Sequence, residues 1–335
     1  MNMKDWLAGV KAAPRKKAMP ILSFPSIQLL GISVTELISS AQNQAAGMKA
    51  VADRTDALAA VSMMDLSVEA ERFGSKIRFS PDEVPTVVGG IVTCAEEAQS
   101  LPVPAVGAGR TGVCVEAIDM ASKMITDRPI FAGMIGPFSL AGRLMDVSEA
   151  MIYCYDDPDM VHLLLRKVTN FLTGYGAAFK AAGANGVVMA EPLAGLLSPA
   201  LAAEFSSRYV KEIVDALQDD SFLVIYHNCG GATVQMTESL AAIGAAAYHF
   251  GNAVDMREIL EKMPPDVLTM GNLDPAGELR GGTPESVRAA TLKLLEECGK
   301  YPNYVISSGC DIPPLSKWEN IDAFFDAAKE YYLSG

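Results

Sequence analysis

Short apolar runs recur along the chain, and polar residues or glycine and proline end most of them. Near-continuous apolar runs of this length are typical of strands that are buried on both faces of a parallel sheet. The pattern predicts eight such strands: MPILSF (19–24), ALAAVSMMD (57–65), PIFAGMIG (129–136), GVVMAEP (186–192), FLVIYHNCG (222–230), AAAYHFG (245–251), VLTMGNLDP (267–275) and YVISSGC (304–310).

Longer amphipathic stretches lie between these runs, and the clearest predicted helices cover residues 157–182, 199–218 and 284–298. Eight strand–helix units in a chain of 335 residues predict an α/β fold of the (β/α)8 TIM barrel type. A doubly wound open sheet is the alternative, but its G-x-G-x-x-G fingerprint after a first strand is missing. No low-complexity segment or Pro/Gly linker divides the chain. We therefore expect a single barrel domain over residues 1–335, with an N-terminal helical lead-in.

One segment interrupts the alternation of strands and helices. FGSKIRFSPDEVPTVVGGIVTC (73–94) has short alternating apolar positions between turn residues. Alternation with period two is typical of a half-buried strand. We expect a hairpin inserted after the second strand, reaching over the mouth of the barrel.

Charge narrows the choice of partners. The chain has 27 Lys and Arg against 40 Asp and Glu, a formal net charge of −13. Nucleic acid binding needs clustered basic residues, so no nucleic acid partner is expected. The one basic cluster, KAAPRKKAMP (11–20), is interpreted as a solvated lead-in rather than a binding patch.

The first twenty residues lack the apolar segment of an export signal, and no uncharged apolar run reaches the roughly 18 residues that span a bilayer. We therefore expect a cytoplasmic protein without a membrane partner. Six cysteines are spread thinly over the chain. In a reducing compartment they are expected to be free thiols or metal ligands rather than disulfides.

The ends of the predicted strands hold the candidate chemistry, because active sites of such barrels lie at the carboxyl ends of the strands. His227 and Cys229 are two positions apart, so in an extended segment both side chains face the same side. Cys310 ends the last predicted strand and can reach the same point in a closed barrel. Two sulfurs and one imidazole form a typical three-ligand set for catalytic zinc, with a fourth position open.

Packing is the alternative for each cysteine, since cysteine is among the most buried residue types. It is the preferred interpretation for the cysteines outside strand ends, and His162, within a predicted helix, is expected to be structural. The cysteines concerned are Cys94, Cys114, Cys154 and Cys298. His227, Cys229 and Cys310 favour a metal site, because a His-x-Cys pair stands at a glycine-rich strand end and a second strand-end cysteine is available.

Other polar residues at strand ends have more than one interpretation. Glu191 precedes Pro192 and is a candidate fourth zinc ligand or proton acceptor, or it caps the following helix. Asp65 is a candidate to hold a polar substrate group or to brace the site. We group Glu191 and Asp65 as candidate catalytic residues. The candidate cofactor-binding residues are His249, Asn272 and Asp274, with support of a ligand, substrate contact and core packing all open for His249.

Six segments resemble the uroporphyrinogen decarboxylase superfamily. They are MDLSVEAERFG (64–74), GPFSLAGRLM (136–145), AEPLAGLLSP (190–199), HNCGG (227–231), MGNLDP (270–275) and SSGCDIPPLS (307–316), in the order of that family. Within it they are most similar to the zinc-dependent corrinoid methyltransferases, which include the methylcobalamin:coenzyme M enzymes. The resemblance implies zinc on His227, Cys229 and Cys310, and Asp65 matches an aspartate that both branches carry.

Departures from the family pattern bear on the substrate. The decarboxylases have an arginine-rich RQAGR segment where residues 23–31 have no arginine, and Gly-His where this chain has Gly309-Cys310. The coenzyme M enzymes resemble ADP-x-AS where this chain has AEPLAG, so Glu191 replaces an aspartate and Gly195 a serine.

The resemblance implies methyl transfer between a methyl-corrinoid such as methylcobalamin and a small acceptor, either a thiol such as coenzyme M or tetrahydrofolate. No D-x-H-x-x-G corrinoid motif occurs in the chain, so the corrinoid is expected on a separate carrier protein. A metal-free lyase of the decarboxylase type and a non-catalytic binding protein on the same barrel are the alternative functions.

Overall fold

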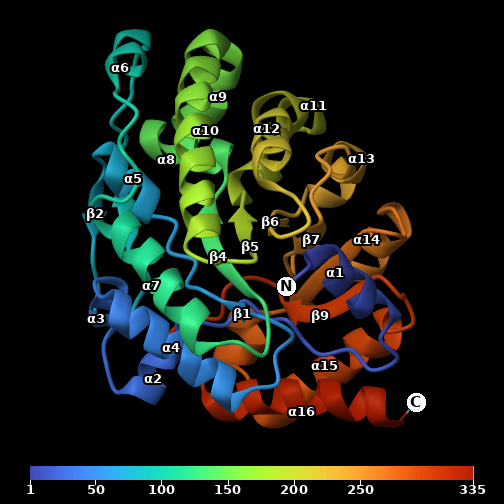
Figure 1. The fold of residues 1–335 in the computed structure, drawn as a ribbon. Helices are drawn as coiled ribbons and strands as arrows, with labels where there is room; N and C mark the ends of the chain where they lie inside the picture. The colour runs from blue at the N-terminus through green and yellow to red at the C-terminus, as the bar shows by residue number, and fades with distance from the viewer. Residues whose placement is uncertain (335) are drawn as a thin grey trace.

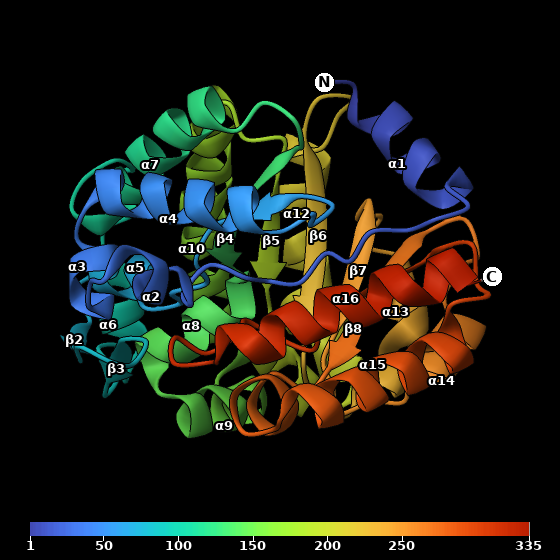
Figure 2. The same ribbon diagram turned by 90° about the horizontal axis from the view of Figure 1, so that it is seen from below.

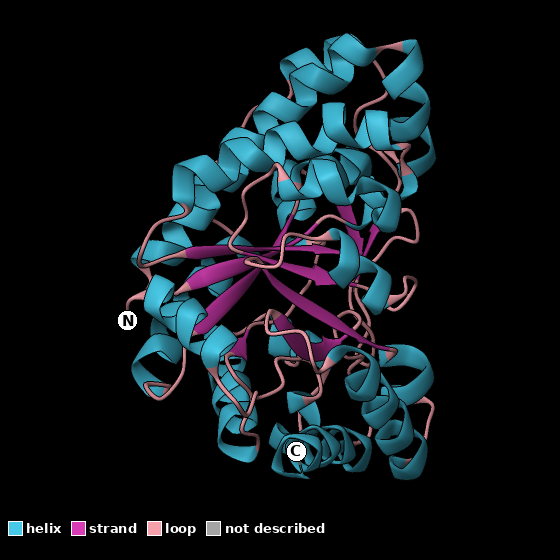
Figure 3. Cartoon of the chain, turned by 90° about the vertical axis from the view of Figure 1, so that its right-hand side faces the viewer, coloured by secondary structure: helices cyan, strands magenta, loops and turns pink. Residues whose placement is uncertain are grey.

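The computed structural model describes residues 1–334 and shows a curled parallel sheet enclosed by helices (Figure 1 and Figure 3). Seven strands are hydrogen-bonded in the order β1-β4-β5-β6-β7-β8-β9. They span Ala60–Val61 (β1), Ile130–Ile135 (β4), Gly186–Ala190 (β5), Leu223–Asn228 (β6), Ala247–Phe250 (β7), Leu268–Leu273 (β8) and Tyr304–Ser308 (β9). Every residue of these strands except Gly133 is buried, which accounts for their apolar runs. The barrel-type α/β fold is confirmed.

Helices cover the outside of the sheet, and a helix lies near each end of the chain. The α-helices are Met3–Ala12 (α1), Ser26–Leu30 (α2), Val34–Ile38 (α3), Ala41–Arg54 (α4), Val68–Phe73 (α5), Ala95–Ser100 (α6), Arg110–Met124 (α7), Pro137–Met145 (α8), Val147–Asp156 (α9), Pro158–Ala181 (α10), Pro199–Ala202 (α11), Arg208–Leu217 (α12), Thr237–Ala241 (α13), Met256–Lys262 (α14), Pro284–Cys298 (α15) and Trp318–Ser334 (α16). Short 3-10 or π segments are Pro192–Leu196 (η1), Ala203–Ser207 (η2), Thr233–Met236 (η3) and Pro275–Arg280 (η4). Within residues 1–334, none of the helices combines the length and the apolarity that crossing a bilayer requires.

The prediction of a regular strand over residues 19–24 is wrong. The segment is buried but irregular, and it fills the gap between the two edges of the sheet. Leu58 N donates to Ala18 O at 2.8 Å on the β1 side, and Met19 N donates to Ile306 O at 3.0 Å on the β9 side. Pro20 has no N–H to continue a ladder, which accounts for the lack of regular pairing. An apolar run therefore closes the barrel here without being a strand.

The N-terminal lead-in begins with a helix, as expected. This helix, α1, packs against side chains that face the barrel interior. Met3 and Val10 are buried in one cluster with residues that face the barrel interior, and the Trp6 and Phe131 ring centroids are 5.8 Å apart. In Figure 2 the segment that follows α1 runs beside α16. The interpretation of residues 11–20 as solvated is wrong for Lys16, whose Nζ donates to the carbonyl oxygens of Tyr301, Pro302 and Tyr304.

The predicted hairpin insert is confirmed. Lys76–Arg78 (β2) pairs antiparallel with Thr86–Val88 (β3), outside the barrel sheet (Figure 2). Its turn lies beside loops at the carboxyl ends of the barrel strands. Arg280 in η4 approaches Glu83 at 3.9 Å, and Val84 borders a cavity with Asp311. The hairpin therefore forms part of the rim of the mouth.

Candidate metal centre

The candidate metal ligands come from two strands that are not neighbours in the sheet. His227 lies in β6, Cys229 follows the last residue of that strand, and Cys310 comes two residues after β9. Strands β7 and β8 separate them in the sheet order. Because the sheet curls into a barrel, the carboxyl ends of β6 and β9 nevertheless converge. The fold thus brings Cys310 to the same end of the barrel as the His227–Cys229 pair, although it is far from that pair in the sequence.

These three side chains form a compact group of potential ligand atoms. One ligand atom from each of His227, Cys229 and Cys310 lies within 4.8 Å of the other two. His227 Nε2 and Cys310 Sγ are 3.5 Å apart. Zn–N and Zn–S bonds of about 2.0 and 2.3 Å in a tetrahedron separate the two ligand atoms by about 3.5 Å. The spacing and the donor types therefore fit zinc.

The contacts among the three side chains shift the pKa values of the two cysteines in opposite directions. A hydrogen bond from the Cys310 thiol, assisted by His227, holds the pKa of Cys229 well below its usual range, while the same bond raises the pKa of Cys310. One thiolate is thus favoured before any metal binds. A bound cation favours the deprotonated form of both cysteines, because thiolates are the ligands.

A chain of hydrogen bonds leads away from His227 on the side opposite Cys310. His227 Nδ1 lies 2.8 Å from His249 Nδ1 and 3.2 Å from the His249 carbonyl oxygen. His249 Nε2 lies 2.7 Å from Ser307 Oγ, and that hydroxyl donates to Met19 O at 2.7 Å. Burial lowers the pKa of His249 well below its ordinary value, which favours the neutral ring. The structure thus places His249 beside a candidate ligand.

The loop after Cys229 is fixed by close backbone packing. Asn228 Oδ1 accepts a hydrogen bond from Gly230 N at 2.9 Å. Gly195 in η1 packs directly against both residues, and a Cβ at position 195 would collide with Asn228 Oδ1 and the Gly230 backbone. The glycine that departs from the family's serine is therefore required by the close approach of η1 to this loop.

Glu191 is buried and its carboxylate faces the start of α8 rather than the sulfur atoms. Oε1 accepts from Phe138 N at 2.7 Å and from Ser206 Oγ at 2.8 Å, and Oε2 accepts from Ser139 N at 2.9 Å. Gly136 is needed beside it, since a Cβ there would overlap the carboxylate. The expected capping of the following helix is wrong, because the Glu191 side chain accepts no hydrogen bond from η1 and binds the first turn of α8 instead. The structure does not bring Glu191 into the group of candidate metal ligands. Its catalytic role remains a prediction.

We expect Glu191→Gln to lower the free energy of unfolding by about 2–3 kcal/mol with little change in zinc content. A carboxylate accepts from three donors here, whereas an amide must point its NH2 group at a donor and leave a buried N–H unpaired. Burial also raises the pKa of Glu191. Denaturant unfolding and metal analysis measure the two quantities. Glu212→Gln, at an exposed position on α12, is the control, and unchanged stability of Glu191→Gln would contradict the capping role.

The other candidate residues hold structure around the mouth. Asp65 is buried, pairs with Arg110, and accepts from Ser67 Oγ at 2.6 Å. Asn272 Nδ2 donates to two carbonyl oxygens of the loop after β7, at 2.9 and 2.8 Å. Asp274 accepts from two backbone N–H groups of η4. The structure joins none of these three side chains to the metal ligands, and their binding roles remain predictions.

Two buried carboxyl groups at the mouth escaped the sequence analysis. Asp311 follows Cys310 directly and accepts from Met64 N at 3.2 Å, and burial raises the pKa of Asp311 to about 8. Glu69 accepts from Ile135 N at 3.0 Å, and burial raises its pKa to about 7. Asp311 was detectable as an acidic residue at a strand end. Glu69 lies within a helix, where a charged residue is usually exposed.

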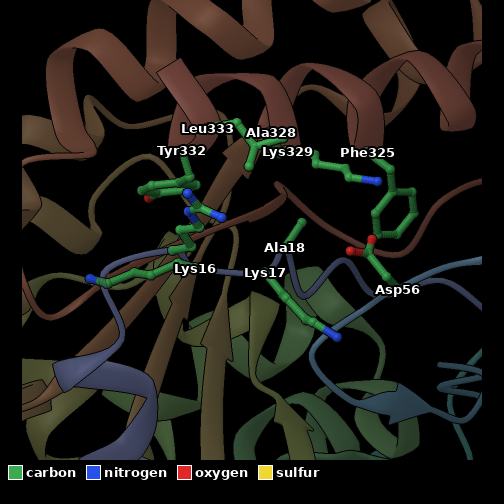
Figure 4. Close-up of a pocket in the computed structure, with 10 residues that line it drawn as sticks. Lys16, Lys17, Ala18, Asp56, Phe325, Ala328, Lys329, Tyr332 and Leu333 are labelled. Carbon is green, nitrogen blue, oxygen red and sulfur yellow. The ribbon is translucent and has the colours of Figure 1, made fainter. Parts of the chain in front are cut away.

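Two cavities border the hairpin turn, and His227, Cys229 and Cys310 line neither of them. A cleft of about 440 Å³ borders Met64, Leu193, Arg143 and the hairpin turn, and a smaller cavity of about 220 Å³ borders Asp311. A third pocket, of about 180 Å³, lies between α16 and residues 15–18, with Lys16, Lys17, Lys329 and Tyr332 on its walls (Figure 4). Lys16 contacts the segment before β9, so this pocket is at the amino ends of the strands. It is remote from the candidate ligands.

Comparison with known proteins agrees with this fold. The model of the uroporphyrinogen decarboxylase (URO-D) family matches residues 15–331, and the chain belongs to that family. A methylcobamide:CoM methyltransferase of Methanosarcina acetivorans is 28% identical over 272 residues, covering 80% of this chain and 78% of the relative. A uroporphyrinogen decarboxylase of Alcanivorax borkumensis is 26% identical over 284 residues, covering 81% and 78%.

The fold is shared with a solved methyltransferase from Methanosarcina mazei. The two structures superpose with a TM-score of 0.86 and cover 97% of each chain at 23% sequence identity. The family is one of enzymes, and both methyltransferases and decarboxylases are among its members with similar sequences. Sequence similarity alone therefore does not distinguish the two activities, and the residues of the site are the remaining evidence.

Proposed function

We propose that this protein is a zinc-dependent methyltransferase that moves a methyl group between a methyl-corrinoid and a small thiol. The observation that supports it is the convergence of His227, Cys229 and Cys310, whose donor atoms lie within 4.8 Å of one another. Two sulfurs and one nitrogen are a soft ligand set that suits a sulfur substrate. A decarboxylase-type lyase needs no such group, and residues 23–31 offer no arginine to hold a polycarboxylate substrate.

The chain's residues have distinct tasks in this proposal. His227, Cys229 and Cys310 would hold zinc, which when bound supplies positive charge that favours the thiolate form of the acceptor. His249 fixes the orientation of His227 through their 2.8 Å contact. In the overall reaction the thiolate takes the methyl group and the corrinoid cobalt is reduced from Co(III) to Co(I), with the electron pair of the broken bond. The corrinoid is proposed to arrive on a separate carrier protein.

The test is zinc-dependent loss of the methyl–cobalt absorption band. The purified protein is expected to hold about one zinc per chain. With methylcobalamin it should demethylate the corrinoid in the presence of at least one member of a panel of coenzyme M, homocysteine, simple mercaptans and tetrahydrofolate. Chelation should abolish this activity and leave the thermal unfolding midpoint within a few degrees, since the barrel has its own large core. Added zinc should restore turnover.

Two outcomes would contradict the proposal. Full activity of the metal-free protein would show that the group of three residues is not the centre of the reaction. Decarboxylation of uroporphyrinogen, with no demethylation of free methylcobalamin or of a methylated carrier protein, would establish the lyase instead. The decarboxylation assay is needed because the chain is similar to known uroporphyrinogen decarboxylases.

A further inference from the structure

The pocket of about 180 Å³ between α16 and residues 15–18 gathers positive charge in a protein that is acidic as a whole (Figure 4). Arg15, Lys16, Lys17 and Lys329 line it, against one acidic residue, Asp56. The whole chain instead has 27 basic and 40 acidic residues. Lys329 comes from the opposite end of the chain, so the fold rather than local sequence brings these cations together.

The exposed cations of this pocket are left without acidic partners by the part of the chain that the structure describes. Within residues 1–334, none of the ion pairs includes Arg15, Lys17 or Lys329. Glu330, which follows Lys329 on α16, pairs with Arg288 on α15 instead. Unpaired like charges that lie close together repel one another, and a bound anion relieves this repulsion.

The backbone that carries Arg15 and Lys17 is held in place by its neighbours. Lys16 Nζ donates to three carbonyl oxygens of the segment that leads into β9, at 2.5–3.1 Å. Ala18 O accepts a hydrogen bond from Leu58 N at 2.8 Å. Figure 4 shows the Lys16 side chain extending away from the Lys329 side of the pocket. A fixed backbone lowers the entropy that is lost when a ligand binds, so the pocket is preorganised.

The remaining walls are apolar or aromatic. They are Ala18, Phe325, Ala328, Tyr332 and Leu333. In Figure 4 the rings of Tyr332 and Phe325 stand at opposite ends of the pocket, with Ala18 and Ala328 between them. Cations beside apolar walls fit an anionic group on a small apolar body. A volume of about 180 Å³ lies below the roughly 300–1,000 Å³ of sites for drug-sized ligands, so the fitting ligand is short.

Phosphate suits this arrangement better than carboxylate. A phosphate monoester carries about 1.5 to 2 negative charges at neutral pH and has three acceptor oxygens. It can therefore contact cations that approach from two separate segments, here residues 15–17 and α16. An arginine offers a planar fork to such an anion, and a lysine adds a point charge.

We propose that this pocket is a binding site for a small phosphate ester, held by Arg15 and Lys329, with its organic part against Phe325 and Ala328. Lys17 also acts on the charge of Asp127, so its contribution is expected to be smaller. The site goes beyond the proposed methyl transfer, because it lies at the amino ends of the barrel strands and uses none of the candidate metal ligands.

Calorimetric titration of the full chain with phenyl phosphate, inorganic phosphate and phenol tests this site, at about 50 mM salt so that screening is weak. Phenyl phosphate should bind more tightly than inorganic phosphate, and phenol should not bind measurably. R15Q and K329Q should each weaken phenyl phosphate binding roughly three- to tenfold, as for loss of one charge-assisted contact at a partly exposed site. K76Q removes an exposed lysine of the β2–β3 hairpin, and this matched control should bind like wild type.

A second readout locates the ligand. Phenyl phosphate should protect Lys329 from acetylation by acetic anhydride, measured by mass spectrometry, and leave Lys76 unprotected. Chelation of zinc should not change the affinity, so failure of the methyltransferase assay leaves this test intact. Equal binding by wild type, R15Q and K329Q would overturn the site, and so would an equal loss in K76Q, which would report net charge alone. Equal affinity for inorganic phosphate and phenyl phosphate would overturn the assignment of an ester.

Discussion

Replacing Cys310 with serine should empty the metal centre and lower zinc-dependent methyl transfer by about a thousandfold or more. Cys310 Sγ is 3.5 Å from His227 Nε2 and is one of only three donors in the group. A hydroxyl is a much poorer zinc ligand than a thiolate, and removal of the cation withdraws several kcal/mol of charge stabilisation. Cys229→Ser should have the same effect. Metal analysis and the rate of loss of the methyl–cobalt band measure the two consequences.

Cys154→Ser is the matched control for these variants. Cys154 is buried in α9 and its Sγ contacts Ala150 O at 3.2 Å, so serine can keep that hydrogen bond. This variant should retain zinc and activity. Wild-type zinc content in both Cys229→Ser and Cys310→Ser would show that the metal is bound elsewhere, and the assignment of the centre would fail.

The arrangement of strands was predictable because burial on both faces leaves a direct mark in the sequence. Seven of the eight apolar runs contain a strand of the sheet. Residues 19–24 have the same mark, since hydrophobicity reports burial and does not report hydrogen bonding. Their backbone reaches both β1 and β9 without regular pairing. Lys16 shows the converse limit, because a basic residue in a basic cluster gives no sign of three distant carbonyl acceptors.

The convergence of the three candidate ligands was predictable for a different reason. His227, Cys229 and Cys310 stand at strand ends, and closure of a barrel brings such ends together whatever their separation along the chain. The contacts of Glu191 were not accessible in this way. A glutamate at a strand end can cap a helix or bind a metal, and only the three contacts with Phe138, Ser139 and Ser206 distinguish the two.

Replacing His249 with phenylalanine should weaken zinc binding by roughly ten- to hundredfold while the fold is retained. His227 can bind a metal through Nε2 only if its proton is on Nδ1, which then donates toward His249. His249 Nδ1 must therefore accept, and its own proton lies on Nε2, where Ser307 Oγ is 2.7 Å away. Ser307 in turn donates to Met19 O. Metal binding to Nε2 of His227 thus fixes the donor and the acceptor in each hydrogen bond from His227 through His249 and Ser307 to Met19 O.

Phenylalanine keeps the ring beside His227 but removes this acceptor. The His249 carbonyl oxygen, 3.2 Å from His227 Nδ1, remains after the substitution, so the loss should lie nearer tenfold than hundredfold. Competition with a chromophoric chelator measures the affinity directly, without reference to turnover. His162→Phe is the control, because His162 is a partly buried histidine of α10 whose ring stacks on Phe205, with centroids 4.6 Å apart. Equal zinc affinity in wild type and His249→Phe would show that the backbone carbonyl alone orients His227.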